Sequence, residues 1–567
     1  MISNRHYGPT LGLSEEIDVM KYRQTGEDFS AKCTRIAHAL KDSDEHFDAF
    51  REILREMRFL PAGRVQNAMG AARQTTAYNC FVSQHLEDDM ASIMSAATAA
   101  AETMRKGGGI GYDFSRIRPR GDLIKSLDSK ASGPVSFMGI FDAVCQTIAS
   151  SGHRRGAQMG VIRIDHPDIM EFINAKHNSD KLTGFNISVG VTDEFMRCLD
   201  ESKPFDLRFE GKVYDSVDPA GLWDAIMRGT WDWAEPGVLF IDTINEYNNL
   251  SYCETIEATN PCGEQPLPPY GACLLGSFNL TQYARSDGHF DFLRFEDDIK
   301  HVVRAMDNVI DRTIYPLPQQ QEEATNKRRM GLGITGLANA GAMLNIEYGS
   351  AAFLLFTQQV LEVLRNECYS VSADLAYEKH PFPLFNQKKY SKSPFVNTLP
   401  EWVQEKIRMF GMRNSHLTSI APCGTISLVA DNISSGIEPP FANEYTRTLK
   451  TFDGDRVETV QDYAFARGFV GKTANEISAE QHLEVLCVAA RYVDSAVSKT
   501  CNVGDDVTYE DFKSLYSDAW RHGCKGITTF RAAGKRYGIL NEIKPTTDEL
   551  DGEACFIDPL TGSKTCE

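Results

Sequence analysis

The stretch Thr-Asn-Pro-Cys-Gly-Glu at residues 259–264 places three side chains of different chemistry at alternate positions. Asn260 carries an amide, Cys262 a thiol and Glu264 a carboxylate. In an extended segment, alternate side chains point the same way, with a rise of roughly 3.3 Å per residue. The three groups would then line one face at steps of about 6 to 7 Å, the span of a sugar ring. The alternative interpretation is a turn around a buried cysteine.

Other cysteines lie beside small or polar residues or near the end of the chain. Cys80 stands in Asn-Cys-Phe-Val-Ser, and Cys273 in Gly-Ala-Cys-Leu-Leu-Gly-Ser. Cys555 and Cys566 belong to a segment with little apolar periodicity. Two thiols in a core and two on a mobile arm favour disulfide exchange between them, although each cysteine alone is typical of an inert packing residue. The 14 cysteines include no Cys-x-x-Cys pair, so neither a zinc ribbon nor a thioredoxin-type motif is expected.

Several glycine-rich or basic stretches have the form of ligand-binding loops. Gly-Leu-Gly-Ile-Thr-Gly (331–336) follows a polar segment rather than a strand, so a tight turn with close backbone packing is expected instead of a dinucleotide site. The glycines of 105–114 favour either a flexible loop or a backbone that passes close to a nucleotide. Pro-Cys-Gly-Thr-Ile-Ser (422–427) could present amides to a phosphate or form an ordinary helix start. The basic loop 151–160 could attract a phosphorylated ligand or lie solvated on the surface.

The elements that must position these residues are of two kinds. Residues 1–70 are expected to form a helical N-terminal segment, and 71–540 alternate strand-like with helix-like runs, which indicates an α/β catalytic domain. Residues 541–567 are typical of a mobile tail. The expected strands are 159–164, 185–191, 237–241 and 416–420, and the expected helices include 88–106 and 351–380.

Length and charge restrict the class of protein. The chain has 567 residues, of which 42% are hydrophobic, and a formal net charge of −19. This acidity disfavours a nucleic-acid partner, whose binding protein usually presents a basic surface. No apolar run approaches the length of a membrane span, and the first residues lack the apolar core of a signal peptide. We therefore expect a cytoplasmic protein without a membrane partner.

Taken together and in this order, these motifs resemble the catalytic chain of ribonucleotide reductases. The similarity runs from about residue 15 to the tail and rests on Asn-Pro-Cys-Gly-Glu, Asn-Cys-Phe-Val-Ser, Gly-Gly-Ile-Gly, Arg-Arg-Gly-Ala-Gln-Met-Gly, Ala-Pro-Cys-Gly-Thr-Ile-Ser and Gly-Cys-Lys-Gly-Ile-Thr. The short loop from 259–264 to Gly-Ala-Cys resembles the class II branch, which depends on adenosylcobalamin. The resemblance implies a ten-stranded α/β barrel, with a finger loop through its centre and Cys262 at the tip of that loop.

The resemblance also implies a reaction, the reduction of ribonucleotides, with ribonucleoside diphosphates as the expected substrates. Cys262 would become a thiyl radical and take the 3′ hydrogen of the ribose. Glu264 would act as general base on the 3′ hydroxyl, and Asn260 would hydrogen-bond the sugar. Cys80 and Cys273 would supply two electrons and finish as a disulfide.

Further positions carry over by matching motif. Ala62 stands where the family often has a hydroxyl residue, and Cys423 where a threonine is usual, so both depart from the pattern. The residues that match substrate contacts are Ala62, Asn79, Cys80, Gly109, Asn260, Pro261, Cys262, Gly263, Glu264, Pro422, Cys423, Gly424, Thr425 and Ile426.

The resemblance implies regulation and partners as well. A dNTP or ATP specificity effector would be held by Asp88, Asp89, Met90, Arg105 and Arg118. The loops 151–160 and 181–186 resemble those that pass its signal to the substrate base, and no ATP-cone is evident at the N-terminus. Thioredoxin or glutaredoxin would be the reductant, with Cys555 and Cys566 as the redox shuttle. A homodimer is expected, and no metal site.

Two alternatives stay open at this stage. A class I-type large subunit would receive its radical from a metal-containing partner through a Tyr-Tyr pair, but this chain has Thr529-Phe530 there, with Tyr537 alone beyond. A nucleotide-binding regulatory protein that has lost the reaction would not need the thiols. The absence of Cys-x-x-Cys also argues against a class III enzyme with its zinc site.

Overall fold

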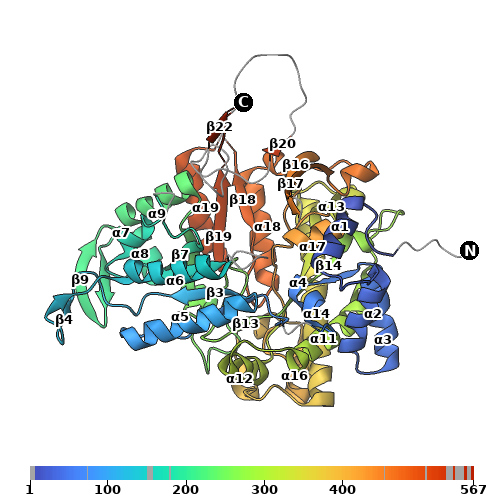
Figure 1. Cartoon of the computed structure of the whole chain (residues 1–567), viewed down its shortest axis with the longest axis horizontal. Coiled ribbons are helices and arrows are strands. Elements are labelled where there is room, and N and C mark those ends of the chain that lie inside the picture. The colour runs from blue at the N-terminus through green and yellow to red at the C-terminus, as the bar shows by residue number, and fades with distance from the viewer. Residues whose placement is uncertain are drawn as a thin grey trace, which may run out of the picture.

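The computed structural model describes residues 7–72, 75–149, 157–177, 181–451, 454–504 and 507–531, together with the short segments 541–542, 555–557 and 564–566. Figure 1 shows strands in the interior and helices around them, so the predicted α/β class is confirmed. Among the described residues, none of the helices combines the length and apolar content needed to cross a membrane.

An eight-stranded sheet forms one half of the interior. Its strands from β2 to β10 run parallel, and β13 and β19 join antiparallel to them. In spatial order the sheet contains β13 (Ala272–Cys273), β2 (Cys80–Val82), β3 (Gly109–Asp113), β6 (Gln158–Arg163), β7 (Phe185–Val191), β10 (Gly237–Phe240), β19 (Gly526–Arg531) and β18 (Thr500–Val503). The runs 159–164, 185–191 and 237–241 are thus confirmed as strands.

A second sheet consists of β1 (Phe59–Pro61), β14 (Leu275–Asn279) and β15 (Gly331–Thr335). Isolated bridges extend it, from Leu332 to Thr418 and from Ile420 to Val497. Because only Leu274 separates β13 from β14, the chain passes directly from the first sheet into the second. The expected strand 416–420 is therefore present only as bridges beside β15.

The glycine-rich stretches fold differently from expectation. Residues 331–335 form strand β15, and only Gly336, at φ +74°, provides the expected turn. Close packing is confirmed, because a Cβ added to Gly333 would lie 2.2 Å from the Ser419 carbonyl oxygen. Residues 109–113 form strand β3 rather than a flexible loop. Both stretches are buried strands in which the missing side chains make room for neighbouring backbone.

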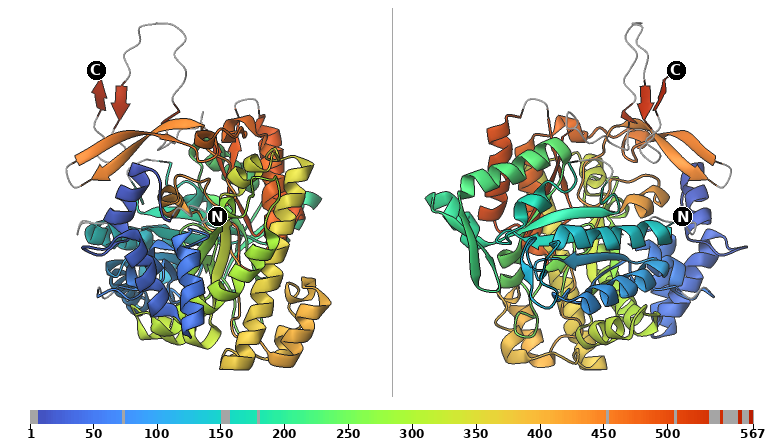
Figure 2. Two further views of the ribbon diagram at one scale, coloured as in Figure 1. Left: turned by 90° about the vertical axis from the view of Figure 1, so that its right-hand side faces the viewer. Right: turned by 60° about the vertical axis from the view of Figure 1, so that its left-hand side comes forward.

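The described part of the N-terminal segment, from residue 7, contains four helices and strand β1. Its helices are α1 (Gly12–Lys21), α2 (Phe29–Leu40), α3 (Asp44–Arg55) and α4 (Gly63–Ala68). Asp28 and Ser43 cap α2 and α3 by accepting hydrogen bonds from backbone amides, which satisfies donors that the first turn leaves free. Figure 2 shows these helices packed against the body of the molecule.

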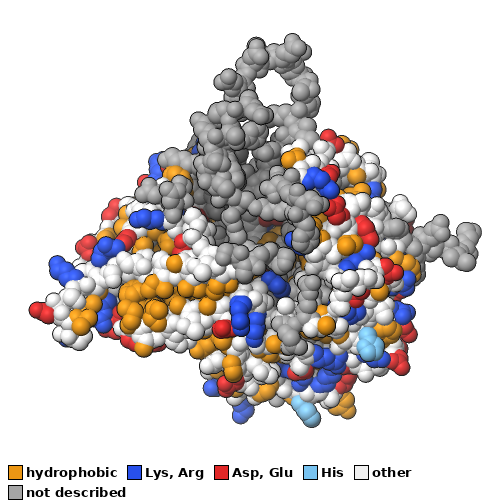
Figure 3. Space-filling model, viewed as in Figure 1, with side chains coloured by type: hydrophobic (Ala, Val, Ile, Leu, Met, Phe, Trp, Pro, Cys, Tyr) orange, Lys and Arg blue, Asp and Glu red, His pale blue; other side chains and the backbone are white. Residues whose placement is uncertain are grey.

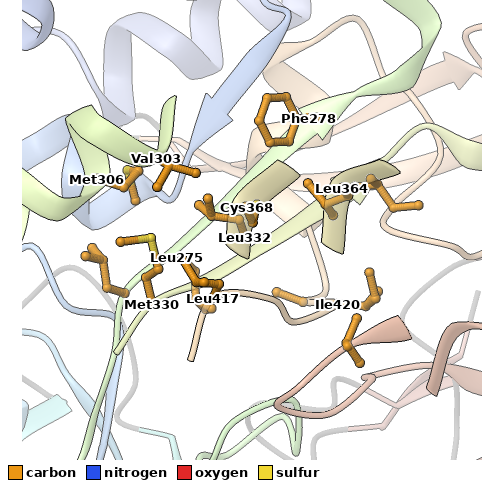
Figure 4. Packing of buried hydrophobic residues seen from close by; sticks show 14 of the residues in the cluster. Leu275, Phe278, Val303, Met306, Met330, Leu332, Leu364, Cys368, Leu417 and Ile420 are labelled. Atoms are coloured by element: carbon orange, nitrogen blue, oxygen red, sulfur yellow. The ribbon is translucent and has the colours of Figure 1, made fainter. Parts of the chain in front are cut away.

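The main core lies between the second sheet and two long helices, α11 (Phe292–Arg312) and α14 (Ala351–Lys379). Figure 4 shows side chains of both layers packed together, among them Leu275, Leu332 and Leu364. Each such side chain contributes about 1.5–3 kcal/mol when fully buried. This core fixes β14 and β15, which follow the hairpin described below.

The remaining elements complete the covering layers. The helices are α5 (Met90–Arg105), α6 (Pro134–Ala149), α7 (Ile169–Ile173), α8 (Asp193–Glu201), α9 (Pro219–Trp233), α10 (Ile241–Glu246), α12 (Pro318–Lys327), α13 (Leu337–Met343), α15 (Gln387–Tyr390), α16 (Glu401–Phe410), α17 (Gly424–Val429), α18 (Ala479–Tyr492) and α19 (Tyr509–Arg521). The paired short strands are β4 (Leu123–Ile124) with β5 (Ser129–Lys130), β8 (Phe205–Phe209) with β9 (Lys212–Val217), β11 (Ala258–Thr259) with β12 (Pro266–Leu267), β16 (Glu444–Thr451) with β17 (Gly454–Gln461) and with β20 (Asn541–Glu542), and β21 (Cys555–Ile557) with β22 (Lys564–Cys566).

Candidate active site

The residues 260–265 form the loop of a hairpin between β11 and β12, called here the 258–267 hairpin. The Asn260 amide donates to the Gln265 carbonyl at 3.2 Å, and the Gly263 amide donates to the Asn260 carbonyl at 3.1 Å. Gly263 has φ +83°, a conformation that glycine adopts without strain. The expectation of an extended segment with three side chains on one face is therefore wrong, because the backbone turns at Pro261–Gly263. Asn260 and Glu264 are buried, whereas Cys262 is exposed at the tip.

The eight-stranded sheet contacts one side of the hairpin. A Cβ added to Gly111 would lie 1.8 Å from the Thr259 carbonyl oxygen, so only glycine lets β3 approach this closely. The Asn186 side chain on β7 donates to the Pro261 carbonyl at 3.0 Å. The glycines of 105–114 thus accommodate the protein's own hairpin, an interpretation that the sequence analysis did not include.

The second sheet contacts the other side. The Glu264 carbonyl accepts hydrogen bonds from the Ser419 hydroxyl and from the Ala496 amide, each at 2.9 Å. A Cβ on Gly331 would lie 2.3 Å from Nε2 of Gln265. The hairpin therefore lies between the two sheets, which fix its backbone from both sides. Ser419 and Ala496 had no signal in the sequence, because they lie more than 150 residues from the loop that they hold.

The two predicted reducing thiols come together beside this hairpin. Cys80 on β2 and Cys273 on β13 are directly opposite in antiparallel register, and the Asn79 amide donates to the Cys273 carbonyl at 3.3 Å. A Cβ added to Gly109 would lie 3.4 Å from the Cys80 sulfur and 3.0 Å from Cγ of Pro261, so the same glycine borders both the thiol pair and the hairpin.

The surroundings of the Cys273 thiol change its pKa. Burial raises the pKa of Cys273 well above its usual value. Hydrogen bonding and charge at Cys80, together with charge on Glu264 and Cys262, raise this pKa further. The structure thus brings Cys80, Cys273, Cys262 and Glu264 into one electrostatic neighbourhood, in which a neutral thiol is the favoured form of Cys273.

Four buried polar atoms around the hairpin have no hydrogen-bond partner within the described part of the chain. They are Oδ1 of Asn79, Nδ2 of Asn260, Oε2 of Glu264 and Nε2 of Gln265. Buried polar groups are nearly always satisfied, so such a group of exceptions is typical of a binding site for a polar ligand. Gln265 was missed by the sequence analysis, although it directly follows the carboxylate.

Glu264 has the protonation behaviour of a general base that works near neutral pH. Burial raises the pKa of its carboxyl to about 7, and the nearby side-chain amide of Asn260, which does not reach hydrogen-bond geometry with it, partly opposes this shift. A carboxylate with such a pKa accepts a proton more readily than an exposed one. The pair Asn260 and Glu264 can therefore both orient a hydroxyl group and take its proton.

The segment 422–426 lies at the start of α17 and could receive a phosphate. Gly424 and Thr425 are exposed, and a Cβ on Gly424 would meet nothing within 4 Å. The first amides of any helix lack acceptors within the helix, so they are available to a ligand. The Cys423 amide is already used, since it donates to the Ser435 hydroxyl at 2.8 Å.

The side chain of Cys423, where the family usually has a threonine, makes contacts inside the protein. Its sulfur lies 3.2 Å from the Ser277 hydroxyl on β14 and is buried. Burial raises the pKa of this thiol, and charge on Glu264 contributes in the same direction, which relates the segment 422–426 to the hairpin. Ala62 is likewise buried, at the start of α4, where its amide donates to the Leu275 carbonyl at 3.1 Å. A substrate contact by Ala62 stays a prediction.

Four of the five predicted effector residues lie together. Arg118 donates to Asp88 from both its backbone amide and its Nε atom, at 3.1 and 2.6 Å. Asp89 caps α5, whose first residue, Met90, is 59% exposed. Arg105 lies at the opposite end of this helix of 16 residues, about 24 Å away at 1.5 Å per residue, and pairs with Glu102 at 2.9 Å.

The positions relevant to the radical source and the tail are placed only in part. The hydroxyl groups of Thr529 on β19 and of Tyr516 share a hydrogen bond of 2.8 Å, and Phe530 follows Thr529 in the strand. Tyr537 and the basic residues 153–155 lie outside the described residues. The backbones of Cys555 and Cys566 pair opposite one another in β21 and β22, while their side chains are outside the description.

Comparison with known families gives one match over most of the chain. Residues 78–530 match the family described as ribonucleotide reductase, barrel domain. That range includes β2 with Cys80, the 258–267 hairpin and the segment 422–426.

Comparison with individual proteins indicates the same family. The chain is 36% identical to a protein of Mycobacterium tuberculosis (strain CDC 1551 / Oshkosh) named vitamin B12-dependent ribonucleoside-diphosphate reductase, over 96% of this chain and 81% of that protein. It is also 36% identical to a Thermoplasma acidophilum protein of the same name, over 87% of this chain and 66% of that protein. The identity to the ribonucleoside-diphosphate reductase large subunit of Variola virus is 26%, over 72% of this chain and 58% of that protein.

Proposed function

The chain belongs to the ribonucleotide reductase family, and we propose that it reduces ribonucleotides, with ribonucleoside diphosphates as substrates, at the 258–267 hairpin. One observation carries this proposal. Cys262 lies at the tip of a turn beside the unsatisfied polar atoms of Asn260 and Glu264, and the Cys80–Cys273 pair borders the same turn. A binding protein would need the polar atoms but not three thiols.

The buried polar atoms match a ribose. Nδ2 of Asn260 is a donor and Oε2 of Glu264 an acceptor, and both lack a partner among the described residues. The hydroxyl groups of a bound ribose offer both functions, so binding would satisfy these atoms and offset the cost of having buried them. The start of α17, where Gly424 and Thr425 are exposed, would receive the phosphates, which are favoured at a helix N-terminus.

The proposed reaction proceeds through a thiyl radical on Cys262. The radical takes the 3′ hydrogen of the ribose, and Glu264 accepts the proton of the 3′ hydroxyl. The 2′ hydroxyl then leaves as water with a proton from one of the thiols of Cys80 and Cys273. These two thiols become a disulfide, and the two electrons and second proton that they release place a hydrogen on C2′ where the hydroxyl was. Glu264 returns its proton to the 3′ oxygen, and Cys262 returns its hydrogen to C3′ and is again a thiyl radical.

We propose adenosylcobalamin as the source of the radical, and three features of the chain fit this cofactor. The Cys262 side chain is exposed, and a Cβ on Gly263 would meet nothing within 4 Å, so the tip of the hairpin borders open space. Position 529–530 is Thr-Phe, so no tyrosine pair is available there to receive a radical from a partner. Two of the relatives reported above are named vitamin B12-dependent. When bound, the cofactor supplies the one-electron chemistry that removes the thiol hydrogen of Cys262.

We further propose that the two sheets form the wall of the family's ten-stranded barrel, with the 258–267 hairpin as its finger loop. Contacts of the hairpin with Gly111 on β3 and with Ser419 beside β15 support this arrangement. The proposed domains are those of the sequence: a helical segment 1–70, a barrel 71–540 and a redox tail 541–567. In the tail, Cys555 and Cys566 would pass electrons from thioredoxin or glutaredoxin to Cys80 and Cys273.

The α5–α6 region is the proposed site of effector binding and of homodimer formation. Asp88, Asp89, Met90 and Arg118 gather at the N-terminal end of α5. Figure 3 shows hydrophobic side chains gathered over the region of α5 and α6, and Met94 of α5 is 46% exposed. A second copy of the chain that packed against this face would cover it.

The experiment that tests the function uses the purified chain alone. With adenosylcobalamin, dithiothreitol and either CDP or CTP, we expect deoxynucleotide formation without a second protein. Activity only after addition of a metal-containing subunit would contradict the cofactor assignment. Absence of product with either radical source would contradict the function itself.

A further inference from the structure

Three cysteines outside the candidate active site lie together in the layer of α18, α19 and the adjoining strands. Cys487 is on α18, Cys501 on β18, and Cys524 is in the connection from α19 to β19. Figure 1 shows these elements side by side. The sulfur atoms of Cys487 and Cys524 are 3.5 Å apart, and both side chains belong to the same buried cluster. Neither thiol has a part in the proposed reaction.

The geometry of this pair is close to that of a disulfide. A disulfide bond is about 2.05 Å long, so the two sulfur atoms need to approach by about 1.5 Å. Cys524 lies in the short connection after α19, where it follows a turn at Gly523, φ +75°, and its amide donates to the Ala519 carbonyl at 3.0 Å. Cys487 lies within the regular helix α18, so its backbone is the more firmly held of the two, and closing the bond shifts Cys524 and the connection that carries it.

The two thiols have different roles available to them. Cys487 keeps 6% of its surface exposed and Cys524 none. A hydrogen bond from Cys524 lowers the pKa of Cys487, and the nearby Arg491 guanidinium acts in the same direction. The same hydrogen bond, followed by burial, raises the pKa of Cys524 well above its usual value. Cys487 is thus the thiol suited to attack an oxidant first. Cys524, whose sulfur lies 3.5 Å away, is the thiol placed to resolve the product.

A continuous set of contacts leads from this pair to the hairpin. Lys525 follows Cys524 directly, and its buried ammonium group donates to the carbonyls of Asp494 and Ser495, at 2.6 and 2.5 Å. The next residue, Ala496, donates its amide to the Glu264 carbonyl at 2.9 Å. A displacement of Cys524 toward Cys487 would therefore pull Lys525 away from the loop that holds Glu264.

We propose that Cys487 and Cys524 form a reversible disulfide that acts as a redox switch on the 258–267 hairpin. The oxidant is a disulfide of the general form RSSR. The Cys487 thiolate attacks one of its sulfurs and releases one thiol, RSH. The Cys524 thiolate then attacks the Cys487 sulfur of the mixed disulfide and releases the second RSH. Two protein thiols are oxidised, one RSSR is reduced to two RSH, and a dithiol reverses the reaction. This switch goes beyond the proposed function, and its test needs no turnover.

The test uses the full chain in a Cys80→Ser/Cys273→Ser background, which removes the pair beside the hairpin. The protein is treated with glutathione disulfide, alkylated, digested and analysed by mass spectrometry. We expect a peptide cross-linked between Cys487 and Cys524 that disappears after dithiothreitol. We also expect amide hydrogen exchange at Ala496 to become at least about threefold faster in the oxidised protein, because the Lys525 contacts loosen.

Two further variants keep the test decisive. With Cys487→Ser added, both the cross-link and the change in exchange should be lost. With Cys501→Ser, which removes the neighbouring buried thiol outside the pair, both should persist. Complete alkylation of Cys487 and Cys524 after oxidation would overturn the proposal. A cross-link without a change at Ala496 would also overturn it, because the pair would then not act on the hairpin.

Discussion

The two cysteine pairs of this chain lie in different surroundings. Cys80 and Cys273 are opposite one another on neighbouring strands, and Cys487 and Cys524 are 3.5 Å apart between a helix and a loop. The first pair borders a hairpin with four unsatisfied polar atoms, one of which belongs to a carboxyl with a pKa raised to about 7. The second lies in a cluster of apolar side chains.

This difference shows what identifies an active site in such a protein. Proximity of two thiols permits a disulfide in either place. Only the first pair adjoins polar groups whose burial is uncompensated until a ligand binds. The unsatisfied atoms of Asn260 and Glu264, rather than the thiols, therefore support the proposed position of the substrate, and the variants below test the difference between the two pairs.

The largest expected effect follows removal of the central thiol. Cys262→Ser should lower turnover at least about 10⁴-fold, because no other group at the hairpin tip can hold the radical. Binding of the substrate, measured by calorimetry, should stay within about threefold, since Asn260 and Glu264 are retained. Deoxynucleotide formation at a substantial rate would exclude a thiyl radical at this position.

The two pairs should differ sharply in steady-state turnover. Cys80→Ser should reduce multiple turnover about 10³-fold, because in the proposed reaction the two electrons for each product come from this pair. Cys487→Ser, the matched control in the other pair, should keep turnover within about twofold under reducing conditions. Equal losses of turnover in Cys80→Ser and Cys487→Ser would contradict the assignment of different roles to the two pairs.

Glu264→Gln should reduce turnover about 10²-fold, because the amide cannot accept the 3′ proton. Since burial raises the pKa of Glu264 to about 7, the wild-type rate should increase with pH through about 7, and the variant should lack this increase. A rate independent of pH between 6 and 8 in the wild type would argue against Glu264 as the base.

Titration of Glu264 should also change the stability of the protein. The stability should decrease as pH rises, whereas the rate should increase. The folded state binds the Glu264 proton more tightly than the unfolded state, so this contribution is present at low pH and is lost as pH rises through about 7. Relative to Glu264→Gln, the wild type should therefore lose up to about 3 kcal/mol of unfolding free energy between pH 4.5 and 8. Denaturant unfolding of both proteins across this range measures it.

A smaller effect is expected at the glycine beneath the hairpin. Gly111→Ala places a Cβ against the Thr259 carbonyl and should cost about 1–3 kcal/mol of stability, with a turnover loss of about tenfold as the hairpin shifts. Gly12→Ala, where an added Cβ meets nothing within 4 Å, is the matched control and should change neither quantity appreciably. Equal melting temperatures for the two variants would contradict the close contact.

The sequence predicted the strands and long helices well because their apolar runs determine them. β6, β7 and β10, and helices α5 and α14, lie where their patterns indicated. It failed where backbone from distant segments decides the conformation. The turn at 260–263 and the strand at 331–335 depend on contacts with β3 and with Ser419, which no local pattern records.

The candidate site could be predicted only through the resemblance. Spacing alone could not place Cys80 opposite Cys273, because 193 positions separate them and register is set by tertiary pairing. The unsatisfied atoms of Gln265 and Asn79 could be identified only from the structure, which shows that Nε2 of Gln265 and Oδ1 of Asn79 are buried without a hydrogen-bond partner among the described residues. The predicted grouping of Arg105 with the other effector residues was not reproduced within one chain, since α5 separates them by its full length.

The most direct test of the central claim is a hydrogen isotope effect at the ribose. The purified chain is given adenosylcobalamin, dithiothreitol and a ribonucleotide with deuterium at C3′, in competition with the unlabelled substrate. If Cys262 takes the 3′ hydrogen, the labelled substrate reacts more slowly and the isotope effect on kcat/KM exceeds one. Deoxynucleotide formed at identical rates from both substrates, or formed equally by Cys262→Ser, would contradict the account.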